Sequence, residues 1–371
     1  MDYKQSYAHS NWTVLIYAAG NNDLEYYIYQ QFQLIINSID AENINVIVQI
    51  SRAPRVGQQH YNIGDINEVW HGTRRYIIKN KTAVLVNDLG EINMSRPNTL
   101  LDFLIWGSSI FPSRNIMLIL SGHGAGFVGI MKENTDKGAT IMGIQGFAEV
   151  LAVFKKITKK TIDVLVFDTC FMDTIEILYE IAINSNAAVD FAIIPKNNLR
   201  VQGLPYYEII EIIKRENVHE LNINEIIKLL TTSVNSNKSD SELHAIHLLE
   251  DDFIILKKLI DSMSEAFKRD SNKFKCRITN LEFYKLNEDF IDLSNLLNQT
   301  PPYYPGLGKI QIELLEVLNK IIIYPELNVK DVGLKLFLPH NSQVYSKYYN
   351  LYIEMSFCRD NGWVKLVREI N

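Results

Sequence analysis

The chain has 371 residues, of which 47% are apolar, so it can bury a sizeable core in one large domain or two small ones. It carries 37 basic and 43 acidic residues, and this balance gives no support for binding nucleic acid. Its three cysteines, Cys170, Cys276 and Cys358, are too few and too widely spaced for a disulfide framework or a C-x-x-C metal site, so we expect no metal.

The sequence shows no targeting or membrane segment. Residues 1–12 are polar and lack the apolar stretch of a signal peptide. No apolar run approaches the about 18 residues that a membrane-spanning helix needs. We therefore expect a protein without a membrane partner that is cytoplasmic, or that is exported by a route the sequence does not show.

The first 205 residues alternate between apolar runs and amphipathic stretches. The runs are rich in Val, Ile and Leu and do not alternate with polar residues, which is typical of strands covered on both faces. They occupy residues 13–19, 45–50, 115–121, 163–168 and 190–195. Amphipathic stretches of helical length occupy residues 22–39, 98–111, 144–157 and 173–184. This order predicts a mainly parallel sheet flanked by helices, with an exposed hairpin beside it in residues 52–97.

After residue 205 the pattern becomes mostly helical. Helices are expected over residues 206–214, 223–234, 251–269, 288–299 and 308–323, with one late strand at 333–339. The polar segment 235–242 is the best candidate for a linker. We therefore predict an α/β domain over residues 1–240 and a mostly helical C-terminal subdomain over residues 241–371 that contributes the late strand.

Two reactive side chains fall just after predicted strands, at the sheet edge where ligand sites of open α/β sheets lie. His123 follows the strand at 115–121, and Cys170 follows the strand at 163–168. An imidazole can take the proton of a nearby thiol, and the thiolate is a strong nucleophile. The backbone amides of Gly124 and Cys170 are then candidates for holding an oxyanion. The alternative is a buried cysteine and a loop histidine with unrelated roles, and this pattern alone does not separate the two.

The helix behind Cys170 is expected to begin near Thr174. Asp173 and Glu176 have the spacing of a capping box, in which each side chain bonds a free backbone amide of the first turn. Cys170 would then lie on the turn between strand and helix, exposed at the edge of the sheet.

Two other patterns give weaker indications. The segment SGHGAG follows a strand but lacks the G-K-[ST] of a P-loop and the G-x-G-x-x-G spacing of a dinucleotide site. His244 and His247 have a metal-ligand spacing for a helix, but their surroundings predict a strand, on which they face opposite sides. We expect neither a phosphate site nor a metal site at these places.

Four stretches resemble the clostripain-like cysteine peptidases, caspase-fold relatives in the clan that also contains gingipains, legumain and separase. WTVLIYAAGNNDLE is similar to the first strand and turn of that family, and LILSGHGAGFVG to its histidine motif. IDVLVFDTCFMDTIEILYEI is similar to its cysteine motif, and VQGLPYYEII to its G-W-P-Y segment. The resemblance covers most of the chain. It implies a caspase-like fold, a cysteine endopeptidase, and a catalytic domain in residues 1–240.

Carried over residue by residue, the resemblance makes Cys170 the nucleophile and His123 the general base. Asp168 matches the family's specificity-pocket aspartate, which implies cleavage after Arg or Lys, and the neighbouring Thr169 stands where Ala is usual in the same pocket. Family members are often activated by cleavage in the loop between histidine and cysteine. In this chain that loop, residues 129–143, contains the candidate sites Lys132 and Lys137. The implied partner is a peptide or protein substrate, no cofactor is required, calcium is possible by resemblance only, and we expect a monomer.

Some positions depart from the family pattern. Phe127 and Leu204 stand where Trp is usual, and Lys196 lies near the expected pocket, where its charge would repel a basic substrate side chain. These departures support an alternative hypothesis: a catalytically weak caspase-like scaffold that binds a partner through its helical C-terminal part.

Overall fold

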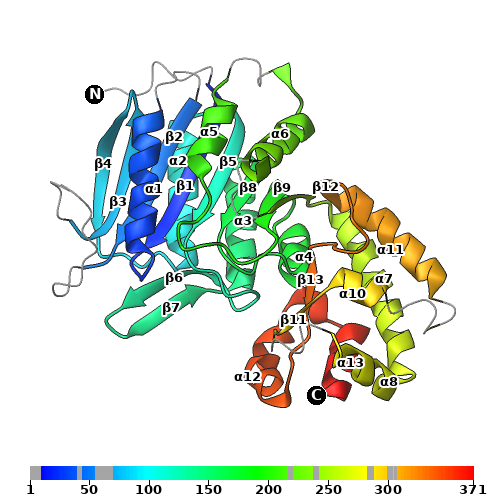
Figure 1. The fold of residues 1–371 in the computed structure, drawn as a ribbon. Coiled ribbons are helices and arrows are strands. Elements are labelled where there is room, and N and C mark those ends of the chain that lie inside the picture. The colour runs from blue at the N-terminus through cyan, green and yellow to red at the C-terminus, as the bar shows by residue number, and fades with distance from the viewer. Residues whose placement is uncertain are drawn as a thin grey trace.

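The computed structural model describes residues 10–39, 44–54, 70–215, 220–236, 242–281, 288–298, 304 and 307–371. The central element of these residues is a nine-stranded sheet (Figure 1). In sheet order its strands are β12 (Ile322–Tyr324), β10 (Leu243–His247), β9 (Val189–Pro195), β8 (Ile162–Asp168), β5 (Ser113–Ser121), β1 (Ser10–Gly20), β2 (Ile44–Arg52), β3 (Gly72–Lys79) and β4 (Thr82–Gly90). Strands β9, β8, β5, β1 and β2 run parallel, and those outside them are antiparallel to their neighbours. The predicted mainly parallel α/β sheet is confirmed.

Strand β1 shows why the central strands are continuous apolar runs. Trp12 and Val14 pack into the core cluster on one face of the sheet, and Leu15 and Tyr17 pack into the cluster on the other face. All four side chains are completely buried. A strand buried on both faces requires a layer of helices on each side.

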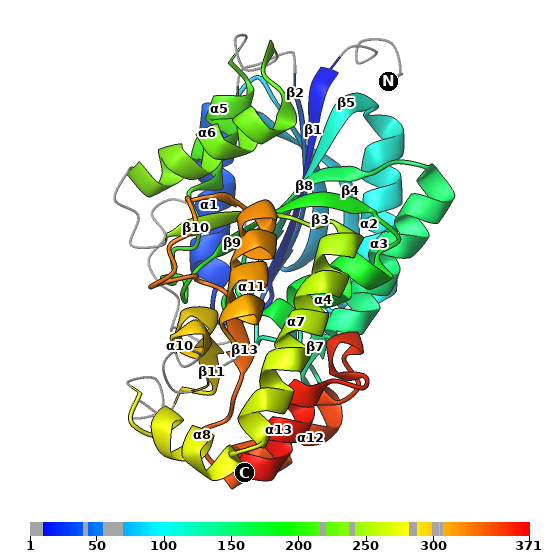
Figure 2. The same cartoon turned by 90° about the vertical axis from the view of Figure 1, so that its right-hand side faces the viewer.

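Helices cover both faces of the sheet (Figure 2). One face is covered by α1 (Glu25–Ser38), α5 (Tyr206–Ile213) and α6 (Ile223–Ser236), whose apolar side chains join the cluster around Trp12. The other face is covered by α2 (Pro97–Ile110), α3 (Ile144–Thr158), α4 (Ile175–Asn184) and α7 (Glu250–Lys268). Because the helices lie on the two faces of the sheet, the loops that lead into them lie at the carboxyl ends of the parallel strands.

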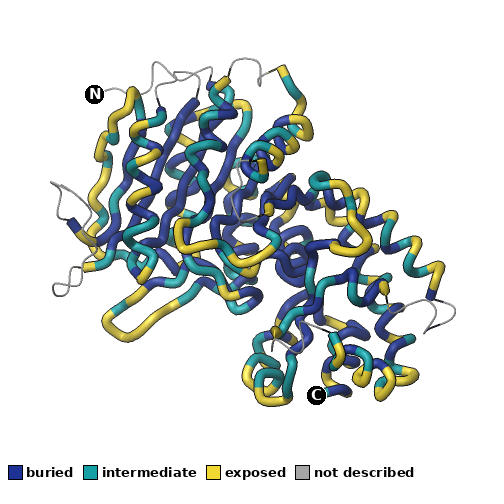
Figure 3. The backbone as a smooth tube through the Cα atoms, in the orientation of Figure 1, coloured by how far each residue is buried: buried dark blue, intermediate teal, exposed yellow. Residues whose placement is uncertain are grey.

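The hairpin predicted in residues 52–97 is formed by β3 and β4, and residues 55–69 lie outside the described part of the chain. The prediction placed this hairpin beside the sheet, whereas β3 pairs with β2 and the hairpin extends the sheet at its edge. Most residues of β4 are exposed, as the colour of the tube in Figure 3 shows, which fits an edge strand.

The C-terminal part is mostly helical, as predicted. It contains α7, α8 (Ser271–Ile278), α10 (Leu293–Leu297), α11 (Gly308–Ile321), α12 (Ser342–Tyr352), a 3-10 turn (Ser356–Cys358) and α13 (Gly362–Ile370).

Two predictions for this part need correction. The late strand is short, β13 (Lys335–Phe337), and pairs with β11 (Phe290–Asp292) in a separate two-stranded sheet. Strand β11 also replaces the start of the helix predicted at 288–299. The main sheet also receives β10 and β12, which lie after the predicted linker. The division at residue 240 stays a prediction, and the sheet itself continues past it.

Candidate functional site

The two reactive side chains are brought together by the register of β5 and β8. These strands are parallel neighbours, and Ser121 pairs with Asp168. His123 and Cys170 therefore each lie two residues beyond a paired position, on adjacent loops at one edge of the sheet. The amide of Gly122 donates to the Asp168 carbonyl at 3.2 Å, which ties the two loops together at their start.

Gly124 permits the close approach of these loops. A Cβ at position 124 would collide with the carbonyl oxygen of Cys170 and would lie 3.2 Å from Cβ of Thr169. Any larger residue would force the histidine loop away from the cysteine loop. Gly124 of the SGHGAG segment thus allows the short distance between the two loops.

His123 and Cys170 line one cavity of about 110 Å³, together with Asp168 and Thr169. The remaining wall comes from α1 and from residues 199–203, which follow β9. The structure therefore gathers the predicted nucleophile, base and substrate-binding residues at one place. The predicted self-cleavage residues do not line this cavity.

The Cys170 thiol is half-buried, and its Sγ atom lies 3.9 Å from the carbonyl oxygen of Leu199. Burial raises the pKa of the thiol above its ordinary value, and the nearby carboxylates of Asp168 and Asp173 raise it further, while the Leu199 contact opposes this. Burial and the two carboxylates thus favour the thiol over the thiolate. A thiol of this kind needs a neighbouring base to become nucleophilic.

His123 is held by an aspartate that the sequence analysis did not include among the site residues. Its Nε2 atom lies 2.9 Å from Oδ1 of Asp23, and Nζ of Lys132 is 3.7 Å from the same oxygen. Partial burial opposes ionisation of Asp23, but the hydrogen bond from His123 and the nearby cations prevail and lower its pKa. With Nε2 engaged, Nδ1 is the remaining imidazole nitrogen of His123.

Asp168 is buried at the end of β8, and both of its carboxylate oxygens accept hydrogen bonds. Oδ2 accepts from the hydroxyl of Ser121 at 2.7 Å, and Oδ1 accepts from the amide of Leu204 at 2.6 Å. Burial raises its pKa to about 6, although these two hydrogen bonds oppose the shift. Gly203 has φ of +70°, and a Cβ there would lie 2.7 Å from Oδ1, so glycine lets this loop pass close to the carboxylate.

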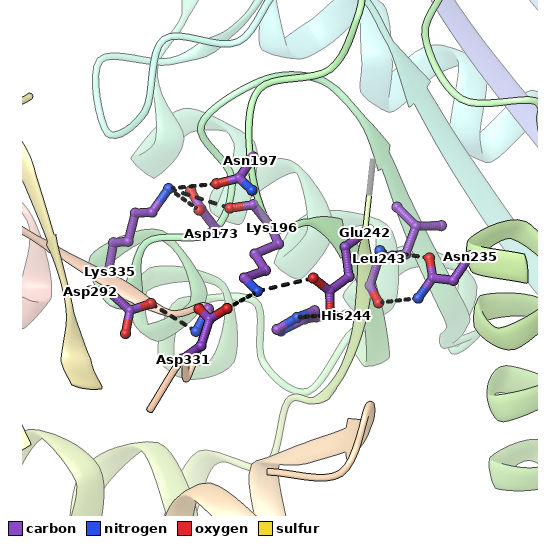
Figure 4. A network of polar contacts seen from close by, with 11 residues as sticks. Asp173, Lys196, Asn197, Asn235, Glu242, Leu243, His244, Asp292, Asp331 and Lys335 are labelled. Atoms are coloured by element: carbon purple, nitrogen blue, oxygen red, sulfur yellow. Dashed lines mark hydrogen bonds and ion pairs between the residues drawn. The ribbon is translucent and has the colours of Figure 1, made fainter. Parts of the chain in front are cut away.

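The expected effect of Lys196 on this pocket is corrected by the structure. Its Nζ atom lies 3.0 Å from Glu242 and 2.5 Å from Asp331, as Figure 4 shows. Lys196 is also absent from the lining of the cavity that contains Asp168. Its charge is therefore compensated locally, away from the pocket that it was expected to oppose.

The predicted capping box is also corrected. Helix α4 begins at Ile175, close to the predicted position, but the side chain of Thr174 makes no capping hydrogen bond. Glu176 is buried and accepts hydrogen bonds from the Phe337 amide and the Tyr352 hydroxyl, both at 2.8 Å. Asp173 forms an ion pair with Lys335 at 2.7 Å. Both carboxylates therefore bind partners that are distant in the sequence.

The two candidate self-cleavage residues lie on the hairpin of β6 (Ile130–Thr135) and β7 (Gly138–Met142). Lys137 is exposed in the turn between β6 and β7. Lys132 lies half-buried within β6, beside Asp23. The residue after it, Glu133, is buried, and its carboxylate contacts the Ser51 hydroxyl at 2.5 Å.

No metal centre emerges from the described ranges: no three His, Cys, Asp or Glu side chains there are placed to hold an ion together. The same residues contain no helix that is both long and apolar enough to cross a membrane.

Comparisons with known proteins bear on this site. The model of the clostripain family, peptidase family C11, matches residues 16–369. Clostripain of Hathewaya histolytica is 23% identical over 408 residues, which cover 91% of this chain and 76% of that protein.

Two solved structures share the fold over nearly the whole chain. An inactive zymogen C11 protease from Parabacteroides distasonis has a TM-score of 0.67 at 17% identity, covering 95% of this chain and 98% of that one. A secreted C11 cysteine protease from Bacteroides thetaiotaomicron, in complex with an irreversible peptide inhibitor, has a TM-score of 0.65 at 16% identity, covering 94% and 99%. These matches confirm the predicted fold.

Proposed function

This chain belongs to the clostripain family of cysteine peptidases, and from that premise we propose that Cys170 is the nucleophile and His123 the general base of its reaction. The observation that carries the proposal is the single cavity lined by both side chains, at the ends of adjacent parallel strands. The geometry supports endopeptidase chemistry, because the cavity lies on the surface loops where an extended peptide can reach it.

The proposed reaction follows from these groups. His123 takes the thiol proton, and the thiolate of Cys170 attacks the carbonyl carbon of the scissile bond. The amides of Gly124 and Cys170 hold the negative charge that develops on the carbonyl oxygen. His123 then gives its proton to the leaving amine, and the acyl group remains on sulfur. A water molecule, deprotonated by His123, attacks the thioester, releases the acid and restores the thiol.

Asp23 is the orienting partner of His123 in this scheme. A carboxylate on Nε2 fixes the tautomer of the ring and stabilises the imidazolium that forms when the thiol loses its proton. Asp23 lies three residues past the end of β1, the sheet neighbour of β5. Three strand ends therefore converge on the reaction.

Asp168 is the proposed selector of Arg or Lys before the scissile bond. A fixed carboxylate suits a guanidinium through paired hydrogen bonds or an ammonium through charge. Thr169 supports this assignment, because its hydroxyl is buried beside the cavity and has no hydrogen-bond partner among the described residues. The cavity holds about 110 Å³, less than the roughly 300–1,000 Å³ of typical ligand sites.

Self-cleavage is proposed at Lys137 in preference to Lys132. A peptidase binds its substrate as an extended and accessible segment, which the exposed turn at Lys137 provides. Cleavage after Lys132 would require Glu133 to leave its buried contact with Ser51.

The sequence features that suggested a weakly active scaffold have structural explanations. Phe127 is buried and fills a core position, where the centroid of its ring lies 4.8 Å from the ring centroid of Phe337. Leu204 is completely buried, and its amide supports Asp168. Lys196 is paired with two acidic side chains. Peptidase function therefore accounts for the site better than a scaffold role does.

The remaining expectations follow the family. The chain acts on peptide or protein substrates as a monomer and without a required cofactor, and calcium dependence is a possibility that rests on the family alone. A cytoplasmic location stays a prediction, and one structural relative is described as secreted.

The proposed function is tested with fluorogenic peptides that end in Arg, Lys or a neutral residue before the reporter. Hydrolysis of the basic peptides by the wild-type chain, lost in Cys170→Ala and in His123→Ala, is the expected result. Hydrolysis that survives Cys170→Ala would refute the assignment of the nucleophile.

A further inference from the structure

A second and larger cavity lies beside the catalytic one. Its volume is about 730 Å³, within the roughly 300–1,000 Å³ of typical ligand sites, whereas the catalytic cavity holds about 110 Å³. Its aromatic lining, here called the aromatic subsite, consists of Phe127, Phe171, Phe290, Phe337 and Tyr348. Nothing in the reaction described above uses this space.

The aromatic subsite adjoins the catalytic cavity, because the same three loops contribute neighbouring residues to the two linings. The histidine loop passes from His123 in one cavity to Ala125 and Val128 in the other. The cysteine loop passes from Cys170 to Phe171. The loop after β9 passes from residues 199–203 back to 197–198. The second cavity is therefore near enough to meet the flanking residues of a peptide whose scissile bond lies at Cys170.

Phe171 is the clearest sign that this surface meets a ligand. It follows the proposed nucleophile directly, and 39% of it is exposed. Its φ of +62° is a conformation that bulky residues rarely adopt. Its ring stacks on that of Phe290 at 6.3 Å and 30°. The two rings form a ready platform for another aromatic or aliphatic side chain.

The charged residues around the aromatic subsite are largely paired with one another. Asp173 is buried and lies 2.7 Å from Nζ of Lys335, which also donates to the Lys196 carbonyl at 3.3 Å (Figure 4). Asp289 lies 2.7 Å from Nδ1 of His340. Apart from Glu288, which is exposed, the charged lining residues are compensated, and the apolar part of the wall is mainly aromatic. This favours an apolar occupant over a charged one.

We propose that the aromatic subsite binds an aromatic or large aliphatic side chain of the peptide substrate, at a position other than the basic residue before the scissile bond. This inference rests on the proposed peptidase function. It also assigns a role to the C-terminal part of the chain, because Phe290 lies on β11, Phe337 on β13 and Tyr348 on α12. Substrate selection is then shared between the catalytic loops and that C-terminal part.

A positional-scanning peptide library with Arg or Lys fixed before the scissile bond tests this inference. At one flanking position, wild type is expected to cleave peptides with Phe, Tyr or Leu at least about tenfold faster than those with Ala. Asn198→Trp, which places a bulky side chain at the exposed rim of the cavity, should abolish that ratio. Phe290→Ala, which removes part of the platform, should reduce it. Asn98→Trp is the matched control, since it lies exposed on α2 and lines neither cavity.

The selectivity ratio is the cleavage rate for peptides with Phe, Tyr or Leu divided by the rate for peptides with Ala, and it is measured separately for each enzyme. A change in overall activity lowers both rates and leaves the ratio unaffected. Cleavage by wild type with no preference at any flanking position would overturn the inference and leave the peptidase function standing. A preference that is equal in wild type, Asn198→Trp and Phe290→Ala would also overturn the inference and leave the peptidase function standing. Absence of cleavage of every peptide by wild type would overturn the proposed function and this inference with it.

Discussion

Nε2 of His123 lies 2.9 Å from Oδ1 of Asp23, although the two residues are 100 positions apart in the chain. The contact joins the loop after β1 to the loop after β5, its neighbour in the sheet. It gives the proposed base a fixed orientation and leaves Nδ1 for the thiol. It also predicts that Asp23 affects the rate of reaction more than the binding of substrate.

Replacement of Asp23 by Asn should lower kcat roughly tenfold, with little change in KM, because the amide cannot stabilise the imidazolium. This decrease in kcat is smaller than the loss of a buried carboxylate would cause, because 70% of the Asp23 side chain is exposed. Asp23→Glu should restore part of the rate. Steady-state kinetics with a basic peptide measure all three enzymes.

Asp88→Asn is the control for this change, because Asp88 lies on β4, distant in the sheet from β5, where it forms an ion pair at 2.9 Å with Arg74 of β3. A wild-type kcat in Asp23→Asn, or an equal loss in Asp88→Asn, would contradict the orienting role.

Asp168→Asn should lower kcat/KM for Arg and Lys peptides by about 100-fold or more, because a basic side chain would then enter a buried site without a counter-charge. Neutral peptides should lose much less. The pH profile gives a second readout: the Asp168 pKa of about 6 means that its carboxylate becomes protonated as pH falls through 6. Selectivity for basic over neutral peptides should therefore decline on that acid limb.

The matched control for Asp168 is Asp163→Asn on the same strand. Its carboxylate accepts from the Ile116 amide at 2.7 Å, near the opposite end of β8. Equal loss of basic and neutral hydrolysis in Asp168→Asn would show that Asp168 supports the fold of the site and does not select the substrate.

Self-cleavage, where it occurs, should depend on Lys137. Incubation of the wild-type chain should give a fragment that begins at Gly138, identified by N-terminal sequencing. The fragment should be absent in Lys137→Ala and in Cys170→Ala, and retained in Lys132→Ala. Cleavage after Lys132 in the wild-type chain would contradict the argument from accessibility.

Burial of Glu176 predicts a pH-dependent stability. Burial raises its pKa to about 7, from the 4.5 of a free glutamate, although its hydrogen bonds from Phe337 and Tyr352 oppose the shift. A carboxyl group with a raised pKa stabilises the fold fully below its unfolded-state pKa, and this contribution is lost as pH rises through 7. The loss amounts to at most about 3 kcal/mol.

Glu176→Gln keeps an acceptor for Phe337 and Tyr352 but does not ionise. The difference in urea-unfolding free energy between pH 5 and pH 8 should therefore be smaller in the variant than in wild type. An unchanged difference would show that Glu176 does not carry this pH dependence.

The sequence predicts the meeting of His123 and Cys170 because both depend on a local rule. Residues that follow neighbouring parallel strands arrive at one edge of a sheet, and each strand is visible as an apolar run. The mainly parallel sheet and most helices follow from the same local periodicity.

Asp23 could not be assigned in this way, although it lies in the NNDLE turn that contributed to the family resemblance. Its role depends on β1 lying next to β5, and that order in the sheet is a tertiary property. Sequence position gave no measure of its distance from His123.

The predictions of a capping box and of repulsion by Lys196 differ from the structure for a related reason. Glu176 has the right spacing for a cap, but it is taken by Phe337 and Tyr352, more than 150 residues later. Lys196 is compensated by Glu242, the last residue of the predicted linker, and by Asp331, which lies well after it. Local patterns give the residue types present, and tertiary contacts decide which partners they use.

The central claim is that Cys170 is a nucleophile activated by His123, and the chain carries its own control for that claim. Cys276 is an exposed thiol outside the site. A peptide chloromethyl ketone that ends in Arg should alkylate Cys170 at least about 100-fold faster than Cys276, as mapped by mass spectrometry, and His123→Ala should remove the difference. Labelling of Cys170 no faster than Cys276 in the wild-type chain would contradict the account.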